Sequence, residues 1–594
     1  MQKTTTSLSN RNLFLLLVFV FFMIWLPRAS GLDTFVYIDE PSWVQRSANF
    51  YYALRHRQFE RTAQNLSPGV TTMWAGAVGF FLEDRAYAAE APGYFGEVPN
   101  NPSAYQHKYD HLEAFLLGRG VDPLDILAAS RAVMVLLISL TLTFAFYFAV
   151  RLFGVWPSVV AFALIAFDPY YLVNSRFAHL DGPMSAFLLL SLLAFMNYLY
   201  LDQRRTFTLV ISALAGAASW LSKQQGILIL PTMLVLLAFY VFDMRPGIKF
   251  TDRLRSFGAL GKYVKPLVLW GVIFIFAMIV AWPAMWQNPS GVLSHLIIQP
   301  VRYIFSSSGS TVLPDEAIEV IGEVGASAVP LNRDWFYYPR SFLWLTTPLV
   351  IIGLFLGLVA YLRRWQLLEQ ETPRRSYAAL WIFALIFTFL IAISLKVANR
   401  YYLPFYLAMD ILAGLGWYAA VGWLSARLQP RFSRWFAPAA LTLVVAMQMF
   451  SSLPIYPYYV PYHNLLLGGN ARASQLRYSG FGEGLELAAD YLNQKPGAAD
   501  LDVISWYAHG PFSSYFVGRS HDVQALTRDI AALAEMDYLV TYRNSWQREY
   551  LTEYFALLDT VQPEYSVELF GIEYARIYAV KDLPPELFTL ELQP

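Results

Sequence analysis

The stretch from Ala128 to Val150 reads AASRAVMVLLISLTLTFAFYFAV, 23 residues that are almost entirely apolar. About 20 such residues in a helix are enough to cross the hydrocarbon core of a bilayer. Stretches of similar character recur along the chain, and we predict about eleven membrane-spanning helices from them. The predicted spans are 12–27, 128–150, 155–173, 183–201, 207–221, 224–242, 266–285, 341–362, 377–395, 401–424 and 437–453.

The composition of the whole chain agrees with this interpretation. Of its 594 residues, 56% are hydrophobic and 14% are charged, against roughly 25% charged residues in a typical soluble domain. Aromatic residues make up 17%, as expected where helices repeatedly cross lipid interfaces. The 43 basic residues balance the 43 acidic ones, so we expect no nucleic-acid partner. The absence of cysteine excludes thiolate chemistry.

Charges in the connecting loops predict the orientation of the spans. With a cytoplasmic N-terminus every cytoplasmic loop is basic, as the positive-inside rule requires. These loops contain Lys3, Arg11, Arg151, Arg204, Arg205, the six basic residues of 244–265, Arg363, Arg364, Arg374, Arg375, Arg427, Arg431 and Arg434. We therefore predict a multi-pass protein of the plasma membrane. A cleaved signal peptide at 12–27 is the alternative to a first span, and it leaves residue 32 onward on the same outer side.

Two long segments between spans are then extracytoplasmic, residues 28–127 and 286–340. In the first, Trp43, Phe50, Tyr51 and Leu54 recur at helical spacing with arginines largely on the opposite face, which predicts an amphipathic helix at the membrane surface. The second contains Gly/Ser-rich stretches, which fit either a mobile flap or a plain connector.

The chain changes character near residue 455. The share of polar residues becomes that of an ordinary soluble domain. A helical pattern at 483–493 is followed by alternating apolar runs and helices. That alternation consists of apolar runs at 501–506, 536–541 and 574–580, and helices near 526–534 and 547–557. It predicts a small α/β domain. The predicted fold is an all-α polytopic membrane domain, residues 1–454, followed by an extracytoplasmic α/β domain, residues 455–594.

Paired carboxylates follow the first span closely. Asp39 and Glu40 lie in Ile38-Asp39-Glu40-Pro41-Ser42-Trp43. Adjacent carboxylates can divide acid and base roles because their repulsion separates their pKa values. A solvated surface pair is the ordinary explanation, but the place near the membrane face favours Asp39 as a base that activates a hydroxyl.

A short outside turn, between the predicted spans that end at 173 and begin at 183, carries a second pair of polar residues. His179 and Asp181 lie in His179-Leu180-Asp181-Gly182-Pro183. Both suit a divalent cation or a polar substrate. A helix-capping aspartate with an interfacial histidine is the alternative. We therefore leave the need for a metal open.

Three cations are predicted at the outside ends of spans, namely Lys223, Lys396 and Arg400. Basic residues are less expected at this face than at the cytoplasmic one. Recognition of a phosphate would explain them, and snorkelling to lipid headgroups is the competing account for each residue taken alone.

These motifs, in their order along the chain, resemble the GT-C membrane glycosyltransferases. The likeness is greatest to glycosyltransferase family 39, the dolichyl-phosphate-mannose–protein mannosyltransferase group, with the lipid A aminoarabinose transferases as relatives. It covers about residues 12–495 and rests on Asp39-Glu40 together with five other motifs. These are Ser67-Pro68-Gly69-Val70-Thr71-Thr72-Met73-Trp74, His179-Leu180-Asp181-Gly182-Pro183, Leu221-Ser222-Lys223, Arg400-Tyr401-Tyr402-Leu403-Pro404 and Phe481-Gly482-Glu483-Gly484-Leu485-Glu486.

The resemblance implies an enzyme that moves a sugar from a polyprenyl-phosphate carrier to an acceptor on the outer face, with inversion. Mannose is the sugar that the mannosyltransferase likeness suggests, and the acceptor would be a protein, lipid or glycan. Asp39 would be the base, with Glu40 supporting it, and His179 and Asp181 would line the same cavity. Lys223, Lys396 and Arg400 would be the candidates for the carrier phosphate. No cofactor is implied with certainty, and a divalent cation is left open.

The chain also departs from this pattern. The aminoarabinose transferases carry Lys-Pro-Pro in the first loop where this chain has Ser67-Pro68-Gly69, and no insertion large enough for a β-trefoil is present. A transporter or flippase for a lipid-linked or anionic substrate is the alternative function, although the absence of a sequence repeat disfavours it. A non-catalytic membrane scaffold is the third, and it would leave the outside charges unexplained.

Overall fold

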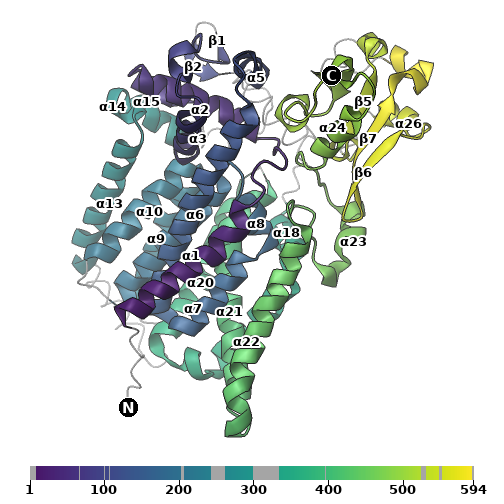
Figure 1. The fold of residues 1–594 in the computed structure, drawn as a ribbon. Coiled ribbons are helices and arrows are strands. Elements are labelled where there is room, and N and C mark those ends of the chain that lie inside the picture. The colour runs from purple at the N-terminus through teal and green to yellow at the C-terminus, as the bar shows by residue number, and fades with distance from the viewer. Residues whose placement is uncertain are drawn as a thin grey trace.

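The computed structural model describes residues 9–65, 67–98, 101–105, 108–201, 206–241, 261–298, 334–394, 397–523, 530–547 and 552–590 (Figure 1). Eight helical segments in this part of the chain are long and apolar enough to cross a membrane, and a bent pair of helices can form a ninth. The eight contain α1 (Asn10–Ala29), α6 (Pro123–Phe153), α9 (Asp181–Tyr200), α11 (Ile229–Val241), α13 (Gly261–Ala281), α20 (Glu371–Ala392), α21 (Leu403–Ser425) and α22 (Pro430–Ser452). The bent pair is α18 (Tyr337–Leu345) and α19 (Pro348–Arg363), which meet at 115°.

Each of the eleven predicted stretches contains helix, but two are too short to count as spans. These are α7 (Val155–Ala166) and α10 (Thr206–Ser222), with 12 and 17 residues. At 1.5 Å per residue, α7 is about 18 Å long, whereas the hydrocarbon core is about 30 Å thick. The predicted stretch 155–173 is interrupted because Asp168 caps a separate helix, α8 (Pro169–Asn174), and accepts a hydrogen bond from the Tyr171 amide. By length and composition, the described residues therefore contain eight candidate spans, or nine with the bent pair, where the sequence predicts about eleven.

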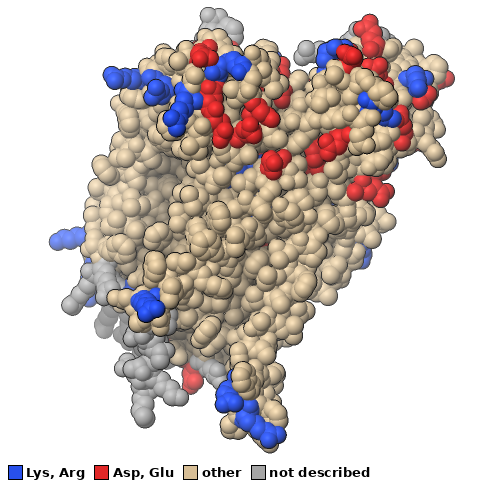
Figure 2. All heavy atoms as spheres, viewed as in Figure 1, with Lys and Arg blue, Asp and Glu red and all other residues tan. Residues whose placement is uncertain are grey.

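The first long loop covers one end of the bundle, which we call the loop face. Its elements are α2 (Glu40–Arg55), α3 (Val70–Glu83), α4 (Tyr87–Glu90), the antiparallel strands β1 (Glu97–Val98) and β2 (Asn101–Tyr105), and α5 (Tyr109–Gly118). In Figure 1 these elements lie at the top, and α1 and α22 both begin at the opposite end. Figure 2 shows charged side chains gathered towards the two ends, with a largely uncharged surface between them.

The helix predicted around Trp43 to Leu54 is present as α2, but its predicted place on the membrane surface is wrong. Its polar side is buried along with its apolar side, and Arg46 is only 9% exposed. The Arg46 guanidinium lies 4.7 Å from the centre of the Trp43 ring, a cation–π contact. Helices α3, α5 and α6 pack against α2, so its polar residues make internal contacts that the sequence pattern did not indicate.

The C-terminal region forms the predicted α/β domain around a five-stranded mixed sheet. The strand order is β4-β3-β5-β7-β6, in which β3 is parallel to β4 and β5, and β7 is antiparallel to β5 and β6. The strands are β3 (Asp502–Ser505), β4 (Arg519–Asp522), β5 (Tyr538–Tyr542), β6 (Tyr565–Leu569) and β7 (Ile572–Ala579). Helices α24 (Leu485–Asn493) and α26 (Thr552–Leu558) accompany the sheet. The predicted fold class is confirmed, and β4 and β6 are the strands that the sequence pattern missed.

The C-terminal domain packs directly on the segment that carries Asp39. Its hydrophobic core is continuous with Phe35, Tyr37 and Phe177 of the membrane domain. The Ile38 amide donates a hydrogen bond to the Phe481 carbonyl at 3.0 Å. This close approach requires glycine at position 482, where φ is +110° and a Cβ would lie 2.2 Å from the Val36 carbonyl oxygen.

Candidate active site at the loop face

Asp39 occupies the position just before α2, at the loop face. Its side chain does not cap the helix. Instead its Oδ2 lies 3.4 Å from His179 Nε2 and 3.2 Å from Arg400 Nη2. The Asp39 side chain is 11% exposed. The side chains around it, those of His179, Arg400, Asp181 and Lys223, are between 1% and 9% exposed. Asp39 is therefore the carboxylate of the group that a substrate can reach most easily.

Asp181 lies at the centre of the group. It begins α9 and accepts two hydrogen bonds of 2.9 Å from Lys223 Nζ, which follows α10. Its Oδ2 is also 3.2 Å from His179 Nδ1 and 3.4 Å from Arg400 Nε. One buried carboxylate thus holds together residues from three helix ends, and Arg400 bridges it to Asp39.

Tyr37 completes the surroundings of Arg400 and was missed by the sequence analysis. Its hydroxyl accepts a 2.9 Å hydrogen bond from Arg400 Nη1. Its ring is stacked between Phe177, at 4.5 Å between centroids, and Phe481 of the C-terminal domain, at 5.7 Å. The available signal was its place two residues before Asp39. The two domains therefore meet on the residue that orients Arg400.

Glu40 lies behind this group rather than in it. It is fully buried and accepts hydrogen bonds from Arg131 Nε at 2.8 Å, the Tyr37 amide at 2.9 Å and the Ala178 amide at 2.7 Å. A second hydrogen bond joins Arg131 Nη2 to the Glu40 carboxylate. Its contacts suit the supporting role that the resemblance implies, because they fix the loop on which Asp39 lies against the turn that contains His179. They do not suit direct contact with a substrate.

Burial lowers the pKa of His179, and the positive charges of Arg400 and Lys223 act in the same direction, while its hydrogen bond with Asp181 opposes them. The imidazole is therefore neutral at neutral pH and carries one N–H. It can donate to only one of its two carboxylate neighbours at a time. This makes His179 suited to holding Asp39 in position rather than to supplying charge.

The structure does not favour a metal ion at this position. The sequence allowed His179 and Asp181 to share a cation, but both oxygens of Asp181 accept hydrogen bonds from Lys223. Among the described residues there is no group of three or more His, Asp or Glu side chains that could hold a metal. Instead, the Lys223 ammonium lies 2.9 Å and the Arg400 Nε 3.4 Å from the Asp181 carboxylate.

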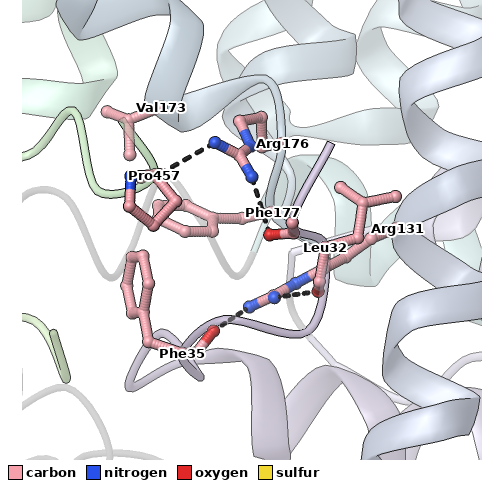
Figure 3. Close-up of a pocket in the computed structure, with 8 residues that line it drawn as sticks. Leu32, Phe35, Arg131, Val173, Arg176, Phe177 and Pro457 are labelled. Atoms are coloured by element: carbon pink, nitrogen blue, oxygen red, sulfur yellow. Dashed lines mark hydrogen bonds between the residues drawn. The ribbon is translucent and has the colours of Figure 1, made fainter. Parts of the chain in front are cut away.

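Figure 3 shows a small cavity next to the start of the first loop, between Phe35, Phe177 and Pro457. Its volume of about 10 Å³ holds no more than about one water molecule. Arg176 and Arg131 line it and donate to backbone carbonyls, Arg176 to Pro457 at 2.8 Å and Arg131 to Phe35 at 2.7 Å. The two arginines hold the loop that leads to Asp39 in place. The cavity itself is too small for a sugar.

The structure thus brings together five of the seven predicted site residues, Asp39, His179, Asp181, Lys223 and Arg400, and places Glu40 directly behind them. The seventh, Lys396, lies outside the described residues. The segment 286–340, which the sequence predicts to be extracytoplasmic, lies largely outside them as well, in 299–333. The functional roles of all seven residues stay predictions.

Comparisons with known proteins add a likeness in structure only. No family model and no curated protein matches the chain. A solved structure of ArnT from Cupriavidus metallidurans bound to undecaprenyl phosphate matches 97% of this chain and 100% of its own, with 14% identity and a TM-score of 0.45. The archaeal oligosaccharyltransferase AglB from Archaeoglobus fulgidus, in complex with an inhibitory peptide and a dolichol-phosphate, matches 96% and 74%, with 14% identity and a TM-score of 0.44. The arabinofuranosyltransferase AftD from Mycobacteria matches 97% and 42%, with 13% identity and a TM-score of 0.38.

The solved structures that this chain resembles therefore include transferases of sugars, the class of protein that its motifs resemble. At TM-scores below 0.5 and identities near 14%, the likeness is too weak to carry a conclusion about activity. The function has to be argued from the residues of the site.

Proposed function

We propose that the protein is an integral membrane glycosyltransferase. It would transfer a sugar from a polyprenyl-phosphate carrier to an acceptor hydroxyl at the loop face, which we place on the extracytoplasmic side. The observation that carries the proposal is the contact of Asp39, the more open of the two carboxylates at the centre of the site, with Arg400 Nη2 at 3.2 Å at the end of an apolar bundle. A base and a guanidinium are then adjacent where a lipid-linked phosphate would meet a polar acceptor.

Asp39 would act as the general base. Its carboxylate would take the proton of the acceptor hydroxyl while the hydroxyl oxygen forms a bond to the anomeric carbon. The hydroxyl would attack that carbon from the face opposite to the carrier phosphate. The bond between the carbon and the phosphate oxygen would break, so the configuration would invert. The bonding electrons would leave on the phosphate, whose negative charge would increase by one.

Arg400 and Lys223 would stabilise that charge. Arg400 contacts Asp39 through Nη2 and Asp181 through Nε, and its planar guanidinium is suited to phosphate oxygens. A phosphate that takes hydrogen bonds from Arg400 would compete with Asp39 for it. Carrier binding would then raise the basicity of Asp39, because the nearby positive charge would be shared with the phosphate.

Lys223 would contribute less directly than Arg400. Its ammonium already makes two hydrogen bonds to Asp181 and lies 4.1 Å from the centre of the Tyr401 ring. Its charge is therefore largely balanced, and its main effect would be to keep Asp181 ionised below Arg400. We assign Lys223 to holding the site and Arg400 to contact with phosphate. The sugar would be a hexose, with mannose the first to test.

The experiment is a comparison of glycans from a deletion strain complemented with variants. Mass spectrometry of its glycoproteins and glycolipids should show one glycan that is lost in the deletion strain and restored by the wild-type gene. Asp39→Asn should fail to restore it, because a positioned base contributes about 100-fold or more to such a step. Asp33→Asn is the matched control, since Asp33 is an exposed residue of the same loop.

Equal amounts of each variant in the membrane fraction exclude a folding defect. Full restoration of the glycan by Asp39→Asn would refute Asp39 as the base. Loss of no glycan in the deletion strain, combined with reduced uptake or movement of an anionic lipid, would favour a transporter instead.

A further inference from the structure

An apolar surface is left exposed where the chain leaves its last span. After α22 the chain forms a short helical turn at Leu465–Leu467 and the helix α23 (Gly469–Leu476). Four large side chains are strongly exposed there: Leu465 at 75%, Leu466 at 63%, Leu476 at 62% and Tyr478 at 66%. We call residues 465–478 the apolar strap.

The strap is unusual for the domain that it begins. Among the described residues after Tyr478, the exposed large apolar side chains are Val517, Tyr565 and Phe570. Phe570 lies close to the strap, because its carbonyl accepts a 3.0 Å hydrogen bond from Asn470. An apolar cluster of this kind on an otherwise polar domain marks a surface that is covered by something other than water.

The position of the strap relative to the spans indicates what covers it. Asn464, just before the strap, donates hydrogen bonds to the Trp344 carbonyl at 2.8 Å and to the Leu343 carbonyl at 2.9 Å. Both acceptors belong to α18, the upper half of the bent membrane pair, and Leu343 is itself 43% exposed. Figure 1 shows α23 level with α18 and with the upper end of α22. The strap therefore begins next to α18, whose Leu343 side chain is exposed as well.

The polar residues of the strap agree with this position. Arg472 is exposed on α23, and Arg477, at the end of the strap, reaches Ser341 of α18. Leucine and tyrosine next to arginine are typical of segments that lie in a bilayer interface. Arginine side chains at that depth can contact lipid phosphates while their stems remain among apolar groups.

We propose that the apolar strap lies in the headgroup region of the bilayer at the loop face. Lipid is the occupant of its exposed surface, so the C-terminal domain rests on the membrane as well as on the bundle. The anchor would keep that domain, and Phe481 with it, at a fixed height above Tyr37 and Arg400. A second copy of the chain is the competing occupant, and the test below distinguishes the two.

The chain has no cysteine, so single cysteines can be introduced without removing others. Leu466→Cys would be labelled with an environment-sensitive fluorophore in lipid nanodiscs that each hold one copy of the protein. Val517→Cys is the matched control, because Val517 is 59% exposed. The Val517 amide donates a hydrogen bond to Asn493 at the end of α24. Helix α24 lies above α23 in Figure 1. Leu476→Cys provides a second strap position.

Lipids that carry a nitroxide in the headgroup should quench the label at 466 and 476 severalfold more than the label at 517. Equal quenching at 466, 476 and 517 would overturn the proposal. A label at 466 that is shielded from lipid quencher only in discs holding two copies would also overturn it, in favour of a protein partner. Neither outcome depends on whether the protein transfers a sugar.

Discussion

Two groups of buried carboxylates lie on opposite sides of the domain boundary, and they are stabilised in different ways. In the membrane domain, Asp181 accepts hydrogen bonds from Lys223 and lies against Arg400. In the C-terminal domain, Glu483 accepts from the Phe481 amide and the Tyr542 hydroxyl, and Glu486 accepts from the Gly484 amide and the Tyr458 hydroxyl. The negative charge of the first group is balanced by cations, whereas the carboxyls of the second group accept hydrogen bonds from neutral donors.

This difference has a consequence for charge. Burial raises the pKa of Glu483 to about 7 and that of Glu486 to about 8, because neutral hydrogen bonds only partly offset the loss of hydration. Both side chains then change protonation near neutral pH. Carboxylates that contact ammonium and guanidinium groups keep their charge instead. We infer that the segment above the site, which carries Glu483 and Glu486, responds to pH.

The largest effect of a single substitution is expected where a cation is removed from the first group. Lys223→Met should destabilise the protein by about 3 kcal/mol, because breaking a buried ion pair leaves a charge without its partner. The value is at the low end of the usual range, since Arg400 and His179 remain beside Asp181. Thermal unfolding of the purified protein in detergent measures this as a lower midpoint.

The double variant Lys223→Met/Asp181→Asn is the control for that measurement. It removes the charge as well as its partner, so most of the lost stability should return. If the single variant melts like the wild type, Asp181 is not held by Lys223, and the contrast between the two groups of carboxylates disappears.

A second effect on stability is expected from pH, and it should arise in the second group. Folding favours the protonated forms of Glu483 and Glu486, because their folded pKa values lie above the ordinary value of 4.5. Their contribution is fully present below about pH 4.5 and is lost as the pH rises through about 7 to 8. The melting temperature should therefore fall across this interval.

The double variant Glu483→Gln/Glu486→Gln isolates that contribution from all other titrations. Its neutral side chains resemble the protonated carboxyls, so its melting temperature should fall less between pH 5 and about 8 than that of the wild type. Parallel pH profiles for the two proteins would mean that these glutamates do not titrate in this range, and the proposed response of the segment to pH would be wrong.

The smallest effect is expected at the contact between the two regions. Tyr37→Phe keeps the ring between Phe177 and Phe481 but removes the hydroxyl that accepts from Arg400. Transfer should fall about tenfold, because a hydrogen bond to a charged group contributes about 1.5 kcal/mol. The loss should appear mainly in the KM for the carrier if Arg400 binds its phosphate.

Tyr515→Phe is the matched control for Tyr37→Phe. The Tyr515 hydroxyl also joins the C-terminal domain to the first loop, through the Asp33 carbonyl at 2.7 Å. Its loss should leave the KM unchanged. Equal effects of the two variants would show that Tyr37 only ties the domains together and does not orient Arg400.

Much of the fold could be predicted because the decisive signal is local. Each of the eleven apolar stretches contains helix, and the predicted strands near 501–506, 536–541 and 574–580 correspond to β3, β5 and β7. The predictions that were wrong concern the surroundings and the length of single helices. Helix α2 has the pattern of a surface helix, yet other elements of the protein bury it. Helix α7 has the composition of a span but only 12 residues, because the apolar stretch is divided between α7 and α8.

The sequence by itself determined which residues could meet at the loop face, because helix direction and loop charge place Asp39, His179, Asp181, Lys223 and Arg400 at one end of the bundle. Only the tertiary structure decided how they pair. That Lys223 binds Asp181, that Arg400 lies between two carboxylates and Tyr37, and that Glu40 is held by Arg131 depend on residues 42 to 363 positions apart. Periodicity describes neighbours along one helix, whereas these contacts arise from the packing of several helix ends and a second domain.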